Sequence, residues 1–156
     1  MTDAERIAAH EAGHACACVV LDVPVRLVDV AGDATALGRV RHGLEQVDNP
    51  DDARKRMMII LCGWIESVED WDELPGWPLE THRSTDEANL AGLADYLGLD
   101  SRGYNDLKYD ALKLTLDREY QSLHIAITGM LGYTPRIGPE LIGRLVRIAR
   151  GTCWST

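Results

Sequence analysis

The chain has 156 residues, of which 46% are hydrophobic, and this excludes a disordered polymer and allows one domain, residues 1–156, with an ordinary core. Sixteen Lys and Arg against 25 Asp and Glu give a net charge of -9. That balance argues against nucleic acid or an anionic membrane as a partner, since both require a cationic face. No apolar run approaches the roughly 20 residues of a membrane span, and the polar first residues do not resemble a signal peptide. We therefore expect a cytoplasmic protein.

The first predicted helix begins after Thr2 and runs to about Leu21. Thr2 and Glu5 have the spacing of a capping box, in which each side chain bonds the backbone N–H of the other. Pro24 ends the helix, because the residue before a proline avoids the helical region.

A His-Glu-x-x-His motif lies on this helix, at His10, Glu11 and His14. Positions i and i+4 share one helix face, so both imidazoles can point at one metal ion while Glu11 reaches a water beside it. The alternative is a solvated helix face that carries these residues by chance. The neighbours are small, which indicates close approach of another backbone instead: they are Ala8, Ala9, Ala12, Gly13 and Ala15. The motif predicts two metal ligands and a general base.

Two strands follow, over about residues 25–30 and 36–42, with a turn signal at Gly32-Asp33 between them. An extended substrate could pair with the edge of such a sheet. The strands could equally serve only to cover the helix, and the sequence leaves both interpretations open.

Asn49 as N-cap and Pro50 at the first helical position predict the start of the second helix. It carries apolar residues at helical spacing up to about residue 68, which is typical of core. Residues 69–83 contain two prolines and read as a loop. The loop holds Trp71 and Trp77, which either border a cleft or pack over the core.

The third helix begins after Ser84, which forms a second capping box with Glu87, and it ends at Gly98. A fourth helix is expected over 106–131 and a fifth over 140–150. The predicted fold class is therefore mainly α with a small β-hairpin or sheet: a zincin-like helical domain of about five helices.

Four cysteines, Cys16, Cys18, Cys62 and Cys153, lack the C-x-x-C spacing of a zinc knuckle or redox pair. We interpret them as small buried hydrophobic residues in a reducing compartment.

A catalytic zinc site needs a third protein ligand and an open position for water. Asp86 lies in the first turn of the third helix, where the helix dipole favours the ionised carboxylate. Local grounds alone leave other candidates open: Glu66, Glu69, Glu80, His42, His82 and His124. The extended motif with a third histidine close behind is absent.

Residues 10–15, His-Glu-Ala-Gly-His-Ala, resemble the H-E-A-G-H-A signature of the FtsH-type zinc peptidase family. Ala36-Leu37-Gly38 resembles the A-L-G of that family's strand beside the active site. Residues 61–66 are similar to its G-R-x-A-E-E helix, although only Gly63 and a glutamate are shared. The resemblance covers roughly residues 4–150, and it implies that Asp86 is the third ligand and that Glu66 is structural.

The resemblance implies a zinc-dependent peptidase with Zn²⁺ on His10, His14 and Asp86 and with Glu11 as general base. Members of that family carry an ATPase module, and the G-x-x-x-x-G-K-[ST] phosphate loop is absent here. We therefore expect a stand-alone peptidase for peptides or unfolded proteins, either self-associating or served by a separate ATPase. Two alternatives are an inert or regulatory binding domain of the same fold and a phage-type regulator that cleaves a repressor.

Overall fold

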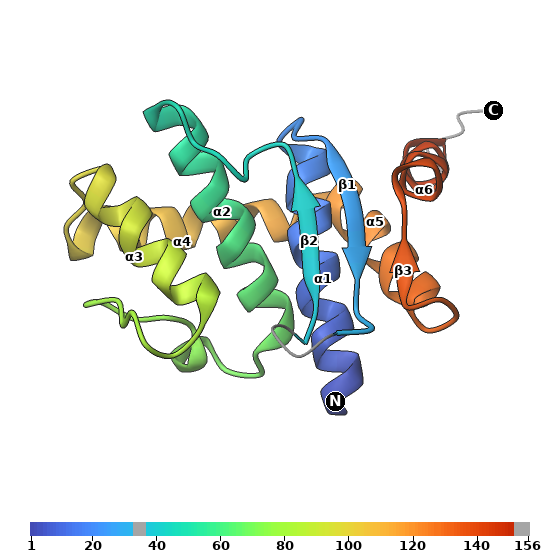
Figure 1. Ribbon diagram of the computed structural model, residues 1–156, viewed down its shortest axis with the longest axis horizontal. Helices are drawn as coiled ribbons and strands as arrows, with labels where there is room; N and C mark the ends of the chain where they lie inside the picture. The colour runs from blue at the N-terminus through green and yellow to red at the C-terminus, as the bar shows by residue number, and fades with distance from the viewer. Residues whose placement is uncertain (33–36, 152–156) are drawn as a thin grey trace.

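In the computed structural model, which describes residues 1–32 and 37–151, helices lie behind and beside a small antiparallel sheet (Figure 1). The first half contains α1 (Asp3–Val20), β1 (Val25–Asp29), β2 (Arg39–His42), α2 (Pro50–Ser67) and a short 3-10 helix, η1 (Trp71–Glu73). The second half contains α3 (Thr85–Tyr96), α4 (Ser101–Thr115), α5 (Arg118–Leu131), β3 (Arg136–Ile137) and α6 (Pro139–Gly151). The mainly α fold with a small sheet is confirmed.

Helix α1 lies in the middle of the molecule, with the sheet in front of it and α5 behind it in the view of Figure 1. The expected capping box of Thr2 and Glu5 is present at its start. A Cβ on Gly13 would lie 2.8 Å from the carbonyl oxygen of Cys62, so only glycine lets α1 approach α2 this closely. The close backbone approach expected from the small residues is therefore confirmed. Cys16, Cys18 and Cys62 are free and buried, as expected, whereas Cys153 lies outside the described residues.

The sheet has the order β2-β1-β3 and is antiparallel throughout. Val28 at its centre pairs with Val40 on one side and with Ile137 on the other. The two expected strands are confirmed over Val25–Asp29 and Arg39–His42. The turn expected at Asp33 and the expected start of the second strand at residue 36 lie outside the described residues. Strand β3 was not expected, because it is only two residues long.

The single helix expected over 106–131 is wrong, because α4 and α5 share this region, and the described residues form six α-helices where about five were expected. Helix α4 begins earlier, after the N-cap Asp100, and α5 begins after Asp117. The carboxylate of Asp117 accepts from the backbone N–H groups of Glu119 and Tyr120, which stabilises a new helix start. Leu116 kept the apolar spacing intact in the sequence but is 64% exposed at the break.

The second capping box, predicted for Ser84 and Glu87, is confirmed for one of its two hydrogen bonds. The Ser84 hydroxyl accepts from the Glu87 backbone N–H, as expected. The Glu87 carboxylate instead accepts from the backbone N–H of Glu80, at 3.2 Å, and so holds the preceding loop against α3. Gly98 adopts a positive φ of 63° after α3, which agrees with its expected role as the helix stop.

His42 at the end of β2 makes folding sensitive to acid. Its Nδ1 accepts a 3.0 Å hydrogen bond from the Leu44 backbone N–H, and burial, followed by the charge of Arg56, lowers its pKa from 6.5 to about 4. The unfolded chain therefore binds a proton at His42 before the folded chain does. We expect the free energy of unfolding contributed by His42 to fall as the pH decreases from 6.5 to 4. Urea unfolding of wild type and His42→Gln across this window should show a shallower pH slope in the variant; equal slopes would contradict the assignment.

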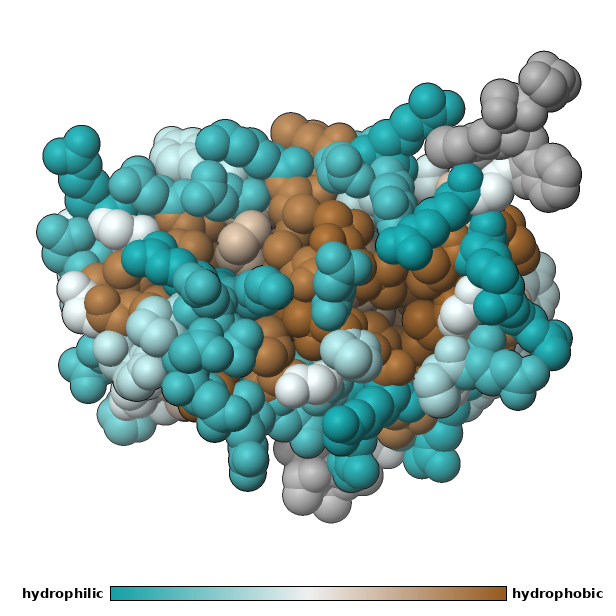
Figure 2. Space-filling model, turned by 90° about the horizontal axis from the view of Figure 1, so that it is seen from above, coloured by the Kyte–Doolittle hydropathy of each residue, from teal (hydrophilic) through white to brown (hydrophobic). Residues whose placement is uncertain are grey.

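The surface combines charged margins with one broad apolar area in the middle of the face shown in Figure 2. Within the described residues, no helix has both the length and the apolar composition needed to cross a bilayer.

Candidate metal centre

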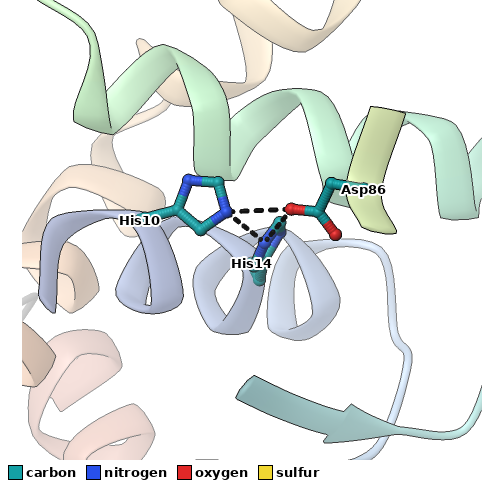
Figure 3. A group of neighbouring side chains, drawn as sticks. All are labelled: His10, His14 and Asp86. Atoms are coloured by element: carbon teal, nitrogen blue, oxygen red, sulfur yellow. Dashed lines mark hydrogen bonds and ion pairs between the residues drawn. The ribbon is translucent and has the colours of Figure 1, made fainter. Parts of the chain in front are cut away.

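Three side chains converge between α1 and α3 (Figure 3). His10 and His14 come from successive turns of α1, and Asp86 comes from the first turn of α3. The Nε2 atom of His10 lies 2.9 Å from Oδ2 of Asp86 and 3.0 Å from Nε2 of His14. The Nε2 atom of His14 lies 3.3 Å from the same carboxylate oxygen. Of the residues that the structure describes, these form the one group of His, Cys, Asp and Glu close enough to hold a metal ion.

The size of this triangle suits a tetrahedral ion. Zinc binds nitrogen and carboxylate oxygen at about 2.0–2.2 Å, which places tetrahedral ligand atoms about 3.3 Å apart. The three edges of 2.9, 3.0 and 3.3 Å are close to that value. The donor set of two imidazoles and one carboxylate, with a fourth position open, is the kind found in catalytic zinc sites. The residues therefore fit a divalent ion of this class.

Hydrogen bonds hold the Nδ1 atoms of both imidazoles, and the Nε2 atoms face Asp86. His14 Nδ1 lies 2.8 Å from the Ile59 carbonyl oxygen, which can only accept, so Nδ1 carries the proton. Ser67 donates its hydroxyl to the Trp64 carbonyl and thus accepts from His10 Nδ1 at 3.1 Å. In neutral imidazoles protonated at Nδ1, the Nε2 lone pair is the one available to a metal ion. Such second contacts fix tautomer and ring orientation in metal sites.

The Asp86 carboxylate and the two imidazoles shift one another's pKa values. Burial opposes the charged form of His14, but the hydrogen bond and charge of Asp86, together with the charge of Glu11, raise its pKa to about 9. Burial alone would raise the pKa of Asp86, yet hydrogen bonds from His10 and His14 hold that pKa well below its usual range. Burial and then the neighbouring His14 lower the pKa of His10. The raised pKa of His14 and the lowered pKa of Asp86 both follow from the close approach of an imidazole and a carboxylate.

Glu11 lies beside the triad in a tight setting. It is 6% exposed, and burial raises the pKa of its carboxyl to about 7, with His14 acting in the opposite direction. A Cβ on Gly38, just before β2, would lie 2.6 Å from Oε1 of Glu11. The glycine thus lets the chain just before β2 approach the carboxylate. Its signal in the sequence was the resemblance of Ala36-Leu37-Gly38 to the family's A-L-G, of which Ala36 lies outside the described residues.

Gly63 of α2 lies against the imidazole ring of His14. A Cβ at this position would fall 2.4 Å from Cε1 and 2.7 Å from Nε2 of the imidazole, both inside van der Waals contact. We expect Gly63→Ala to push the ring out of the triad and lower metal affinity on the order of 10–100-fold, as other changes around metal ligands do. Metal titration of the purified variant checks this, with Gly92→Ala on α3 as control, since a Cβ there meets nothing within 4 Å. Equal affinities in both variants would contradict the role of Gly63.

The triad opens into a cleft of about 510 Å³. Its walls come from α1, the chain at β2, the end of α2 and the start of α3, and they combine apolar side chains with two arginines: Arg6, Ile7, Leu37, Arg39, Val40 and Trp64. Trp71 and Trp77 do not line this cleft; they lie against Tyr109 and Tyr104 of α4, at 5.8 and 5.9 Å between ring centroids. Trp77 thus lies against a buried core residue, Tyr104, whereas Trp71 stacks on the exposed Tyr109, and both tryptophans are themselves exposed.

The other candidate third ligands lie elsewhere in the described structure. Glu66 contacts His124, with 3.5 Å between Oε2 and Nε2, and is not part of the triad. His42 accepts from its own turn, and Glu69 lies 4.0 Å from Arg6. Glu80 and His82 precede α3 and are also outside the group. The structure brings together the three ligands expected from the sequence, while Ser67, the Ile59 carbonyl and the steric role of Gly63 were missed.

Comparison of the chain with protein-family models, with curated proteins and with solved structures gives no match. The chemistry of the site is therefore argued from its own geometry.

Proposed function

We propose that this protein is a metallopeptidase that uses Zn²⁺ to hydrolyse peptide bonds. The observation that carries the proposal is the convergence of His10, His14 and Asp86 on one point, with Glu11 beside them at the wall of an open cleft. A purely structural ion would need neither a neighbouring carboxylate nor an open side. The resemblance of residues 10–15 to the FtsH-type signature supports the same choice.

His10, His14 and Asp86 would hold the ion, which when bound polarises the scissile carbonyl and makes the attacking water more acidic. Glu11 accepts a proton from that water as it attacks and then delivers it to the departing amine. Its raised pKa, near 7, suits a group that must both take and release a proton around neutral pH. Gly38 lets the chain just before β2 lie against this carboxylate without a side chain between them.

The substrate class that suits the cleft is an extended peptide or an unfolded protein. Strand β2 is at one edge of the sheet, and Arg39 and Val40 of this strand line the cleft. An extended chain can add to such an edge by backbone hydrogen bonds, which are independent of sequence. A folded protein offers few such extended segments, because most of its backbone groups are already paired.

Digestion of an unfolded model protein such as casein tests the proposal. Zinc-loaded protein should cleave it, and a chelator should stop cleavage that added zinc then restores. Absence of cleavage by protein shown to contain zinc would favour an inert binding domain of the same fold. Cleavage that persists in His14→Ala would reveal a contaminating peptidase instead.

A further inference from the structure

Helix α5 contacts the metal-binding helix on the side away from the sheet (Figure 1). Tyr120 is fully buried, and its hydroxyl donates to the Gly13 carbonyl at 3.3 Å. His124, one turn later, has its Nε2 atom 3.2 Å from the Ala9 carbonyl oxygen. The two rings are stacked, with an interplanar angle of 6°. Two polar side chains of α5 therefore bond the backbone of α1 one turn apart.

The two carbonyls that receive these bonds belong to the residues directly before the ligands. Ala9 precedes His10, and Gly13 precedes His14. A helical carbonyl has a second lone pair beyond its own helix bond, so both contacts can form without breaking α1. Any rotation of α1 about its axis would stretch both bonds and would also swing both imidazoles. The contacts therefore act on the orientation that the metal site depends on.

Glu66 connects this pair to α2. Its Oε2 atom lies 3.5 Å from Nε2 of His124, and its carboxylate is near enough to Tyr120 for the two groups to shift each other's pKa. Because both the Ala9 carbonyl and the carboxylate are acceptors, Nε2 of His124 must carry a proton. The same helix α2 supplies Gly63, Ser67 and the Ile59 carbonyl to the ligand side of α1. Helix α2 therefore contacts the ligand side of α1 directly and the opposite side through His124.

We propose that Tyr120, His124 and Glu66 are positioning residues that fix the rotation of α1 and so set the two histidine ligands for the metal. The inference rests on the proposed metal site but concerns residues that touch neither ion nor substrate. A metal or catalytic constellation must be held to within about 0.5 Å and 10–20°, which packing of small residues alone does not ensure. Ala9, Ala12 and Gly13 offer little side chain to resist rotation, so directional hydrogen bonds take that role.

Substitutions on α5 that remove one hydrogen-bonding group at a time test the positioning role. Tyr120→Phe deletes only the hydroxyl, and His124→Leu deletes the donor. His124→Gln retains an N–H donor and serves as rescue. Thr128→Ala is the matched control, because its hydroxyl bonds only carbonyls of α5 itself. Co²⁺ is the probe: its affinity is measured by absorbance titration, and urea unfolding of the metal-free proteins reports on stability.

We expect Tyr120→Phe and His124→Leu to lower Co²⁺ affinity by about 10–100-fold and to change the visible spectrum. His124→Gln should lie closer to wild type than to His124→Leu, and Thr128→Ala should bind like wild type. If Tyr120→Phe and His124→Leu bind Co²⁺ like wild type while His14→Ala does not bind it, the positioning role is overturned. The metal site itself is then still supported. The positioning role is also overturned if the loss of Co²⁺ affinity across the four variants is proportional to their loss of stability in urea. Wild type that binds no Co²⁺ would remove the metal site and the inference together.

Discussion

Glu11→Gln should retain the metal and lose turnover. The amide has nearly the shape of the carboxylate, so it fits beside Gly38, but it cannot accept a proton from the attacking water. General-base groups contribute typically 10²–10⁴-fold, and we expect the rate of casein cleavage to fall by about that factor. Cleavage by zinc-loaded wild type and variant at equal metal content is the measurement.

The control for this experiment is metal stoichiometry. Glu11 is not one of the three side chains of the triad, so replacing it by an amide should leave metal binding intact. A variant with full metal content and wild-type activity would show that another group is the base. A variant that loses its metal would place Glu11 among the ligands instead, which the triad geometry does not suggest.

Asp86→Ala and His14→Ala should each abolish binding of the ion. Each variant removes one of three ligand atoms that lie 2.9–3.3 Å apart, and the two that remain do not make a catalytic zinc site. The loss of affinity should exceed the 10–100-fold typical of changes outside the ligand set. Elemental analysis after dialysis should find about one zinc per chain in wild type and far less in both variants.

Glu66→Ala and Glu80→Ala extend this comparison to the glutamates that the sequence left open as ligands. Neither belongs to the triad, so both variants should retain the ion, with Glu66→Ala weakened only as a positioning residue. Zinc lost with His14→Ala but kept by Asp86→Ala would reject Asp86 as ligand. Wild type without zinc, even after zinc is added, would favour a binding domain of the same fold.

Several helix boundaries could be predicted because their signals are local. Thr2, Asn49 and Ser84 each cap the helix that follows them, and the capping bond involves residues three apart. The break at Asp117 was missed although its signal is of the same kind. The apolar spacing of Leu112, Leu116, Tyr120 and Leu123 continued across it, and periodicity outweighed a single capping residue.

The positions of His10, Glu11 and His14 relative to one another followed from the sequence, because residues on one helix are related by the helix itself. Asp86 was predicted by its place in a first turn and by the family resemblance, but its distance from the histidines depends on how α3 is placed against α1 and α2. Only the tertiary structure decided that distance. It also decided which groups support the ligands: the Ile59 carbonyl, Ser67, Gly63, and the α5 pair Tyr120 and His124. These contacts join residues that are 45 to 115 positions apart, for which helical periodicity carries no information. The local motif determines which chemistry is available, and packing of the helices decides whether the groups meet.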